Sequence, residues 1–272
     1  MPIISDYHLH SSYSADSSEP MEQMVLAAIK KGLKQICFTE HMDLEYPYRE
    51  NKKENRFEFN TDSYLYEILT LKEKYESSIS INFGVELGLQ EDIMRQNAIY
   101  AKSHDFDFII ASIHVCHKKD PYYPEFFEGR SEKDALTEYF QCVYENIRNF
   151  NSYDVLGHLD YVIRYSPNKD SNYSYQTYRD LIDTILNHLI ENEKGLECNT
   201  GGLKSGLKDV HPCLDILKRY RELGGEIVTV GSDAHNAGQV GDSFDRACEV
   251  LKEAGFKYYT IFDGRMPEYL KL

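Results

Sequence analysis

Short apolar runs alternate with longer amphipathic stretches along the whole chain. The apolar runs are typical of buried β-strands, and they cover residues 3–7, 35–39, 80–85, 106–112, 154–157, 195–199, 226–230 and, most weakly, 257–261. Between them, apolar residues recur at helical spacing in residues 20–32, 64–75, 92–102, 132–150, 175–191, 210–223 and 243–254. Strands that alternate with helices predict parallel strands joined by right-handed crossovers, the pattern of an α/β fold.

The number of strand–helix units favours a barrel. Seven or eight units in 272 residues, without a linker-like tract, indicate one closed barrel rather than an open sheet. We therefore predict a single domain over residues 1–272. Two segments interrupt the alternation of predicted strands and helices. Residues 42–60 are highly charged, and residues 116–130 are rich in Pro, Tyr and Phe. Both follow a predicted strand, so we expect both at the C-terminal rim, where the loops of such barrels build active sites.

Composition narrows the possible functions. The formal net charge of −15 argues against a broad basic surface for nucleic acid, although a small anionic substrate is compatible with it. No apolar run approaches the ~18 residues of a membrane-spanning helix. The six cysteines are scattered without a CxxC pair, as in proteins with reduced thiols. We expect a cytoplasmic protein with no membrane partner, and its oligomeric state stays open.

The predicted strands share an unusual kind of C-terminal residue. The segments IISDYHLH, ICFTEH, INFGVE, FDFIIASIH, YDVLGH and EIVTVGSDAH all end in imidazoles or carboxylates. These residues are His8, His10, His41, Glu86, His114, His158, Asp233 and His235. A closed parallel barrel would gather all of them at one mouth.

Spacing and residue type point to metal ions. His8 and His10 are two residues apart, so on an extended strand both project from one face. Asp233 and His235 have the same relation if the strand stays extended there. Imidazole and carboxylate are ligands of Zn, Mn and Fe. Each residue alone is more often structural, but six of the ten histidines lie at predicted strand exits, which favours a polynuclear metal centre.

The remaining histidines are less informative about function. His104, His188 and His211 lie on or beside predicted helices, and we expect them to be structural or exposed. His117 and Arg130 belong to the segment 116–130 and could line the pocket.

The ordered set HLH, TEH, GVE, SIH, GHLD and SDAH resembles the polymerase-and-histidinol-phosphatase (PHP) family of metal-dependent phosphoesterases. The motifs extend from residue 8 to residue 235. The segment LECNTGGLK and the FFEGR region further resemble the histidinol-phosphatase members of that family. This resemblance implies a distorted (β/α)7 TIM-like barrel that holds three divalent transition-metal ions, Zn, Mn or Fe.

The resemblance also implies a ligand set. One ion would be held by His8, His10, Glu86 and Asp233. Glu86 would bridge to a second ion held with His114 and His158. Asp16, His41 and His235 would hold the third. Asp16 lies in the Ser-rich loop SSYSADSS, where an aspartate is ordinarily a turn or helix-capping residue.

The implied activity is hydrolysis of a small phosphate monoester, with L-histidinol phosphate of histidine biosynthesis as the expected substrate. A hydroxide that bridges two metals would supply the nucleophile, because a bound divalent cation lowers the pKa of water from ~15.7 towards ~7. We expect Glu86, Asp233 and His235 to be the catalytic residues. Arg164 and Lys204 are candidates for binding the phosphate oxygens, although each can equally be an ordinary solvated charge.

Three alternatives stay open at this point. A nucleotide or nucleic-acid phosphodiesterase of the same family could use the same cluster, but the charge of −15 disfavours a polymeric substrate. A metal-binding module without catalysis would usually lack some ligands, and none is missing here. An amidohydrolase-type barrel commonly adds a bridging lysine at a strand end, and these strand ends contain none.

Overall fold

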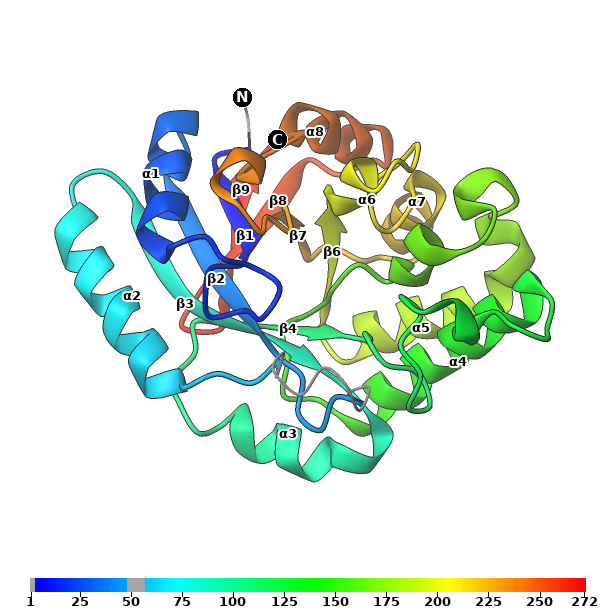
Figure 1. Cartoon of the computed structure of the whole chain (residues 1–272). Coiled ribbons are helices and arrows are strands. Elements are labelled where there is room, and N and C mark those ends of the chain that lie inside the picture. The colour runs from blue at the N-terminus through cyan, green and yellow to red at the C-terminus, as the bar shows by residue number, and fades with distance from the viewer. Residues whose placement is uncertain (1–2, 48–56) are drawn as a thin grey trace.

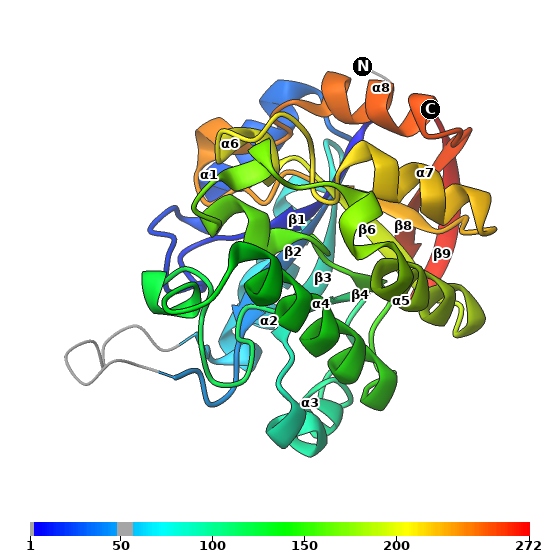
Figure 2. The ribbon, with the colours of Figure 1, turned by 90° about the vertical axis from the view of Figure 1, so that its right-hand side faces the viewer.

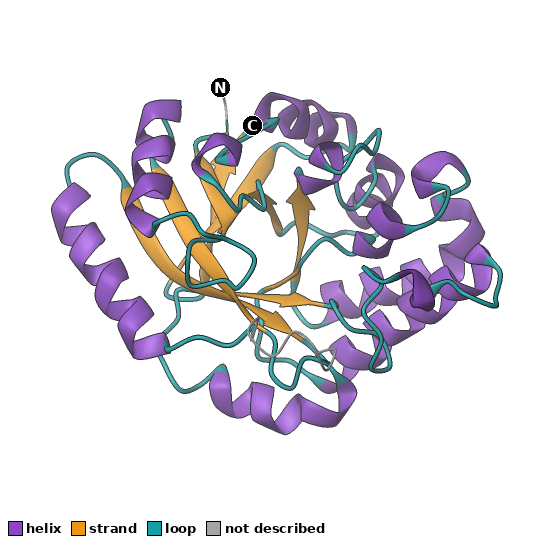
Figure 3. Cartoon of the chain, viewed as in Figure 1, coloured by secondary structure: helices purple, strands orange, loops and turns teal. Residues whose placement is uncertain are grey.

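A seven-stranded parallel sheet, curled into a barrel, forms the centre of the molecule (Figures 1 and 3). This computed structural model describes residues 3–47 and 57–272. The strands follow one another in chain order around the sheet. They are β1 (Ser5–Leu9), β2 (Gln35–Met42), β3 (Ser80–Gly88), β4 (Phe108–Ser112), β5 (Val155–Leu156), β6 (Gly195–Asn199) and β7 (Val228–Gly231). The predicted α/β barrel of seven strand–helix units is confirmed.

The strands are buried along almost their whole length because both of their faces are covered. Every residue of β1, β4, β6 and β7 is buried, and only the first residue of β2 and of β3 is not. Parallel sheets enclosed by helices show this continuous burial instead of an alternating pattern. The predicted run 195–199 coincides with β6, and the other six agree with their strands to within a few residues.

Helices surround the barrel, as the rotated view in Figure 2 shows. They are α1 (Met21–Lys31), α2 (Thr61–Tyr75), α3 (Met94–Tyr100), α4 (Glu132–Asn149), α5 (Arg179–Glu191), the short α6 (Gly201–Lys204), α7 (Leu214–Glu222) and α8 (Phe244–Glu253). Helix α1 follows Pro20 and is capped after Lys31 by Gly32, whose φ of 84° is the left-handed conformation expected just beyond a helix C-terminus. The predicted helices are therefore confirmed, with shorter ends for most of them.

The barrel closes between its first and last strands through a few backbone contacts. Leu9 forms an isolated parallel bridge with Ala234, three residues beyond the end of β7. Two hydrogen bonds support it, from His10 N to the Ala234 carbonyl and from Asp233 N to the His8 carbonyl, both of 2.9 Å. Four residues predicted to form the site thus lie in or beside the closing contact.

The weakest predicted strand, residues 257–261, is not part of the barrel. It belongs to β8 (Tyr258–Asp263), which pairs antiparallel with β9 (Met266–Lys271). Phe262 of this hairpin accepts hydrogen bonds at its carbonyl from the Tyr7 hydroxyl and the Asn82 amide, both of 2.7 Å. Its ring packs against Phe108 at the start of β4. The hairpin therefore covers the N-terminal end of the barrel, opposite the predicted site.

The two segments that interrupt the alternation of strands and helices lie at the C-terminal end of the barrel. Residues 116–130 follow β4, and residues 43–47 and 57–60 follow β2, as expected for loops at the C-terminal rim. The rest of the charged segment, residues 48–56, lies outside the described residues. Within the part of the chain that the structure describes, no helix combines the length and apolarity required to cross a membrane.

We predict that Phe262→Ala destabilises the fold by about 3–5 kcal/mol, because it removes a buried ring that packs against Phe108. Urea unfolding followed by circular dichroism measures this free energy. Tyr258→Ala in the same strand is the matched control, because that side chain is 49% exposed and should cost less than about 1 kcal/mol. Equal losses for the two variants would contradict the covering role of Phe262.

Candidate metal centre

The ends of six barrel strands deliver the predicted ligands to one place. His8 lies in β1, His41 in β2 and Glu86 in β3, while the others follow their strands by one to four residues. Those others are His10 after β1, His114 after β4, His158 after β5, and Asp233 and His235 after β7. Because parallel strands of a barrel all end at the same rim, residues far apart in sequence become neighbours.

Glu86 lies at the centre of the cluster and is completely buried. Its two carboxylate oxygens lie between 2.9 and 3.5 Å from ring nitrogens of five imidazoles. These belong to His8, His10, His41, His114 and His158. Ser112 also donates its hydroxyl to Glu86 Oε1 at 2.6 Å.

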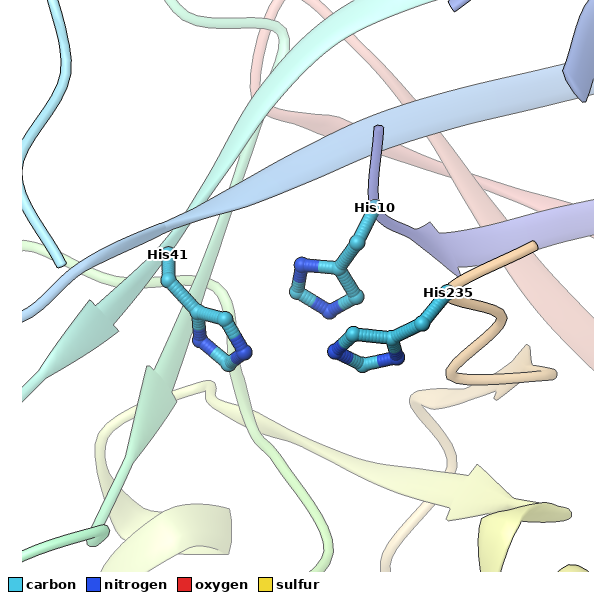
Figure 4. Close-up of side chains that lie close together, drawn as sticks. All are labelled: His10, His41 and His235. Atoms are coloured by element: carbon cyan, nitrogen blue, oxygen red, sulfur yellow. The ribbon is translucent and has the colours of Figure 1, made fainter. Parts of the chain in front are cut away.

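Asp16, His41 and His235 form the outer part of the cluster. Asp16 Oδ2 lies 3.2 Å from His235 Nε2 and 3.5 Å from His41 Nε2. The His10 ring stacks on both of these imidazoles, with centroids 4.2 Å apart in each case. Figure 4 shows the three rings converging from different segments. The loop aspartate therefore lies beside the imidazoles that the resemblance assigned to it.

Asp233 reaches the cluster by a route that the sequence did not predict. The strand does not stay extended between residues 233 and 235: β7 ends at Gly231, and Asp233 has a φ of 53°. This left-handed conformation is uncommon for a residue with a side chain. Asp233 Oδ1 nevertheless lies 3.9 Å from His8 Nε2, 3.7 Å from His10 Nε2 and 3.6 Å from His235 Nδ1.

The donor atoms of this cluster fit metal ions. His8 Nε2, His10 Nε2 and His41 Nδ1 lie 2.9–3.5 Å from Glu86 Oε2. These four atoms are buried, and none makes a hydrogen bond of normal geometry with a described residue. Buried polar atoms without partners are costly, and metal coordination would satisfy these four. Triads whose ligand atoms lie within 4.8 Å of one another include His8–His10–Asp233, His8–Glu86–His158, His41–Glu86–His114 and His10–His41–His235.

The electrostatics favour an ionised Glu86 and a neutral His10. Burial would raise the pKa of Glu86, but the imidazoles of His8, His114 and His41 outweigh it and hold the pKa well below its usual range. Burial, together with His235 and His41, holds the pKa of His10 well below its usual value. An ionised carboxylate and a neutral imidazole are the forms that ligate metal. Nearby carboxylates, despite burial, raise the pKa of His8, His41 and His114, so metal would displace protons from these three rings.

A second layer of carboxylates fixes the orientation of the imidazoles. His8 Nδ1 lies 2.6 Å from Glu197 Oε1, and His114 Nδ1 lies 3.0 Å from Asp43 Oδ2. Ligating histidines in metalloproteins are generally held in this way. Sequence reasoning missed both carboxylates. Asp43 follows His41 by two residues, as His10 follows His8, and that spacing is the signal that could have found it.

The position of Glu197 depends on a glycine opposite it. A Cβ atom at Gly231 would lie 2.5 Å from Glu197 Oε1 and 2.3 Å from His8 Cβ. No side chain fits there without moving one of them. Gly231 thus allows the last barrel strand to approach the first at the site.

The two predicted phosphate-binding residues lie beside Asp233, in different ways. Arg164 Nη2 donates to Asp233 Oδ2 at 3.3 Å, and the guanidinium lines the cavity. Lys204 Nζ donates to the Asp233 carbonyl oxygen at 2.6 Å and is not among the described lining residues. The geometry favours Arg164 for substrate contact, whereas Lys204 supports the backbone of Asp233.

His211 lies shortly before α7 and is structural, as expected. It is completely buried and pairs with Asp160 through Nδ1 at 2.5 Å. Arg164 Nε donates to its other ring nitrogen at 3.4 Å. His211 therefore supports the guanidinium from behind. His117 and Arg130 instead pair with Glu138 on α4, and neither lines the cavity.

A cavity opens above the cluster. Its lining combines cluster residues with residues of the rim. The cluster residues are Asp16, His41, His114, His158, Asp233 and His235. The rim contributes Asp43, Tyr46, Phe57, Asp120, Tyr161, Arg164 and Tyr165. A small ligand that enters this cavity reaches the cluster from its solvent side.

A parallel barrel with imidazoles and carboxylates clustered at the C-terminal mouth defines a metal-binding (β/α) barrel protein. The chain belongs to the PHP family: the PHP domain matches residues 6–201. The family resemblance of the sequence motifs is therefore confirmed.

Individual relatives match along almost the whole chain. A histidinol-phosphatase of Lactococcus lactis is 35% identical over 260 residues, which cover 95% of this chain and 94% of that protein. A probable histidinol-phosphatase of Clostridium acetobutylicum is 33% identical over 98% of this chain and 100% of its own length. The crystal structure of histidinol phosphate phosphatase from L. lactis, in complex with zinc, L-histidinol and phosphate, has a TM-score of 0.88 at 33% identity. That match covers 98% of this chain and 99% of the other.

We predict that Glu86→Gln loses most of its bound metal, because the amide lacks the charge that lies between five imidazoles. Metal analysis of the purified protein measures the loss, and an unchanged circular dichroism spectrum would show that the fold is kept. Glu91→Gln, at an exposed position away from the cluster, is the matched control and should keep its metal. Full metal content in Glu86→Gln would exclude Glu86 as a bridging ligand.

Proposed function

We propose that this chain is a metal-dependent phosphatase that converts L-histidinol phosphate to L-histidinol and phosphate. The proposal rests on one observation: buried ring nitrogens without a hydrogen bond converge on Glu86. The chain that carries this cluster has histidinol-phosphatase relatives along almost its whole length. The L. lactis structure with zinc, L-histidinol and phosphate supports the same substrate.

The proposal includes three divalent ions, Zn, Mn or Fe. His8, His10, Glu86 and Asp233 would hold the first, and Glu86, His114 and His158 the second. Asp16, His41 and His235 would hold the third. The contacts of Glu86 with rings on both sides of it support its role as the shared ligand. When bound, the ions would lower the pKa of coordinated water and neutralise phosphate charge.

The residues of the chain itself would position the ester. Arg164 lines the cavity beside Asp233, and its guanidinium also lies over the Tyr161 ring, 4.8 Å from the centroid. A guanidinium held in this way can donate two parallel hydrogen bonds to phosphate oxygens. Asp233 and His235 line the same cavity, so of the three proposed catalytic residues they lie nearest the bound ester. Glu86 would act from below by holding two ions at a fixed separation.

Two further features belong to the proposal. A small substrate is supported because Arg164 is the one arginine or lysine among the described lining residues, which is too few for a nucleic-acid backbone. A cytoplasmic location is supported by the six cysteines, all of which are free thiols.

Purified protein should release phosphate from L-histidinol phosphate, and an excess of chelator should abolish this turnover, because the cluster residues alone supply no nucleophile. A nucleotide diester, assayed in parallel, should be hydrolysed at least ~100-fold more slowly. Phosphate release is measured with a colorimetric assay before and after metal is restored. Preferential hydrolysis of the diester would replace the proposal with the phosphodiesterase alternative.

Arg164→Ala should raise the KM for L-histidinol phosphate by about 10- to 100-fold, since it removes a charge-assisted contact to phosphate. Lys204→Ala should mainly lower kcat, since its ammonium supports the Asp233 carbonyl outside the cavity. Steady-state kinetics with both variants separate the two effects. An unchanged KM in Arg164→Ala would remove Arg164 from the substrate site.

A further inference from the structure

The cavity above the cluster is lined by four described carboxylates, and three of them have cationic or imidazole partners. Asp16 contacts His235 and His41. Asp43 accepts from His114 Nδ1 through both oxygens, at 3.0 and 3.1 Å. Asp233 pairs with Arg164. The fourth, Asp120, differs from these in its environment.

Asp120 has only neutral donors among the residues that the structure describes. Its Oδ1 accepts a hydrogen bond of 2.7 Å from the Tyr122 backbone nitrogen, and its Oδ2 accepts one from the Tyr46 hydroxyl. No lysine, arginine or histidine of the described ranges, residues 3–47 and 57–272, forms an ion pair with it. Burial and the nearby charge of Asp43 both raise the pKa of Asp120.

Aromatic rings surround the space beside this carboxylate. Tyr161 and Tyr165 line the cavity, with ring centroids 5.2 Å apart and hydroxyl groups 3.1 Å apart. Phe57 lines it as well and packs edge-on against His41, 5.4 Å away. Aromatic faces near a carboxylate form a favourable environment for an organic cation.

A carboxylate in this position opposes the binding of a phosphate ester that carries no other charge. The phosphate dianion would be repelled by Asp120, whereas an ester with an ammonium group near its phosphate would be attracted. Selectivity of this kind combines an attractive contact for one ligand with a repulsive one for its competitors. L-Histidinol phosphate has this distribution of charge, because its ammonium is on the carbon next to the phosphorylated CH2–O group.

We propose that Asp120 accepts a hydrogen bond from the substrate ammonium group and thereby selects amino-alcohol phosphates over phosphate esters without an amine. This inference rests on the proposed phosphatase function and adds a specificity-determining residue to it. Arg164 and the cluster bind the phosphate end, and Asp120 binds the amine. The Tyr46 hydroxyl and the Tyr122 amide hold the carboxylate in place.

The test compares two substrates in one protein preparation. One is L-histidinol phosphate, and the other is imidazolylpropyl phosphate, which keeps the imidazole and the phosphate but lacks the amine. In Asp120→Asn, kcat/KM should fall by about 10- to 100-fold for the first and should stay the same or rise for the second, because the repulsion of an amine-free ester is removed. Because the ratio of the two values is measured within the same variant, partial loss of folded protein cancels.

The matched control is Asp92→Asn, which neutralises an exposed carboxylate paired with Lys118 outside this cavity. It should leave the ratio of the two substrates at the wild-type value. Calorimetry gives a readout that does not depend on turnover. With inorganic phosphate present, Asp120→Asn should weaken L-histidinol binding by a similar factor and leave imidazolylpropanol binding unchanged.

An unchanged ratio in Asp120→Asn, or an equal loss for both substrates, would overturn the role of Asp120 while leaving the phosphatase function intact. Failure of the wild-type protein to hydrolyse either ester would overturn the proposed function itself. In that case unequal effects of Asp120→Asn on binding of the two alcohols would still support the ammonium contact, and equal effects would reject it.

Discussion

A single buried negative charge determines how this site is built. Glu86 has no access to solvent, and five imidazoles contact its two oxygens. An isolated carboxylate in such a place would cost several kcal/mol of desolvation, so it persists only when cations or dipoles compensate it. The imidazoles can do this in the absence of metal by taking up protons, and metal ions can do it when they replace those protons. The surrounding strands therefore have to deliver several rings to one point, and the barrel does so from β1, β2, β4 and β5.

The general plan of both fold and site could be predicted from the sequence because it depends on few geometric facts. Apolar runs alternating with amphipathic ones require parallel strands, and parallel strands in a barrel end at one rim. The position of each candidate ligand then needs no knowledge of side-chain rotamers. Asp16 is different: it lies within the loop between β1 and α1, not at the end of a strand, and the family resemblance alone assigned it to the cluster.

Features that depend on tertiary contacts could not be predicted in this way. Glu197 is one of five buried residues in β6, and nothing in the pattern says that its carboxylate faces His8. Asp233 adopts a left-handed conformation that alternation cannot reveal. Residues 257–261 have the composition of a barrel strand, but they pair with a downstream partner and cover the opposite end. His211 was assigned to its local element, whereas its partners Asp160 and Arg164 come from a segment about 50 residues away.

The narrow contact between Leu9 and Ala234 has a consequence for how the protein matures. The residues it joins are separated by most of the chain, so β1 has to wait for the last barrel strand before its histidines acquire their final neighbours. Pairing across such a separation is slow compared with local helix formation. During synthesis, a chain that has not yet emerged as far as β7 would have a sheet with an open seam and a set of ligands without Asp233 and His235. Ions bound at that stage would have a different set of ligands from that of the complete barrel. The timing of barrel closure, as well as the chemistry of the ligands, would therefore influence which metals the mature protein retains.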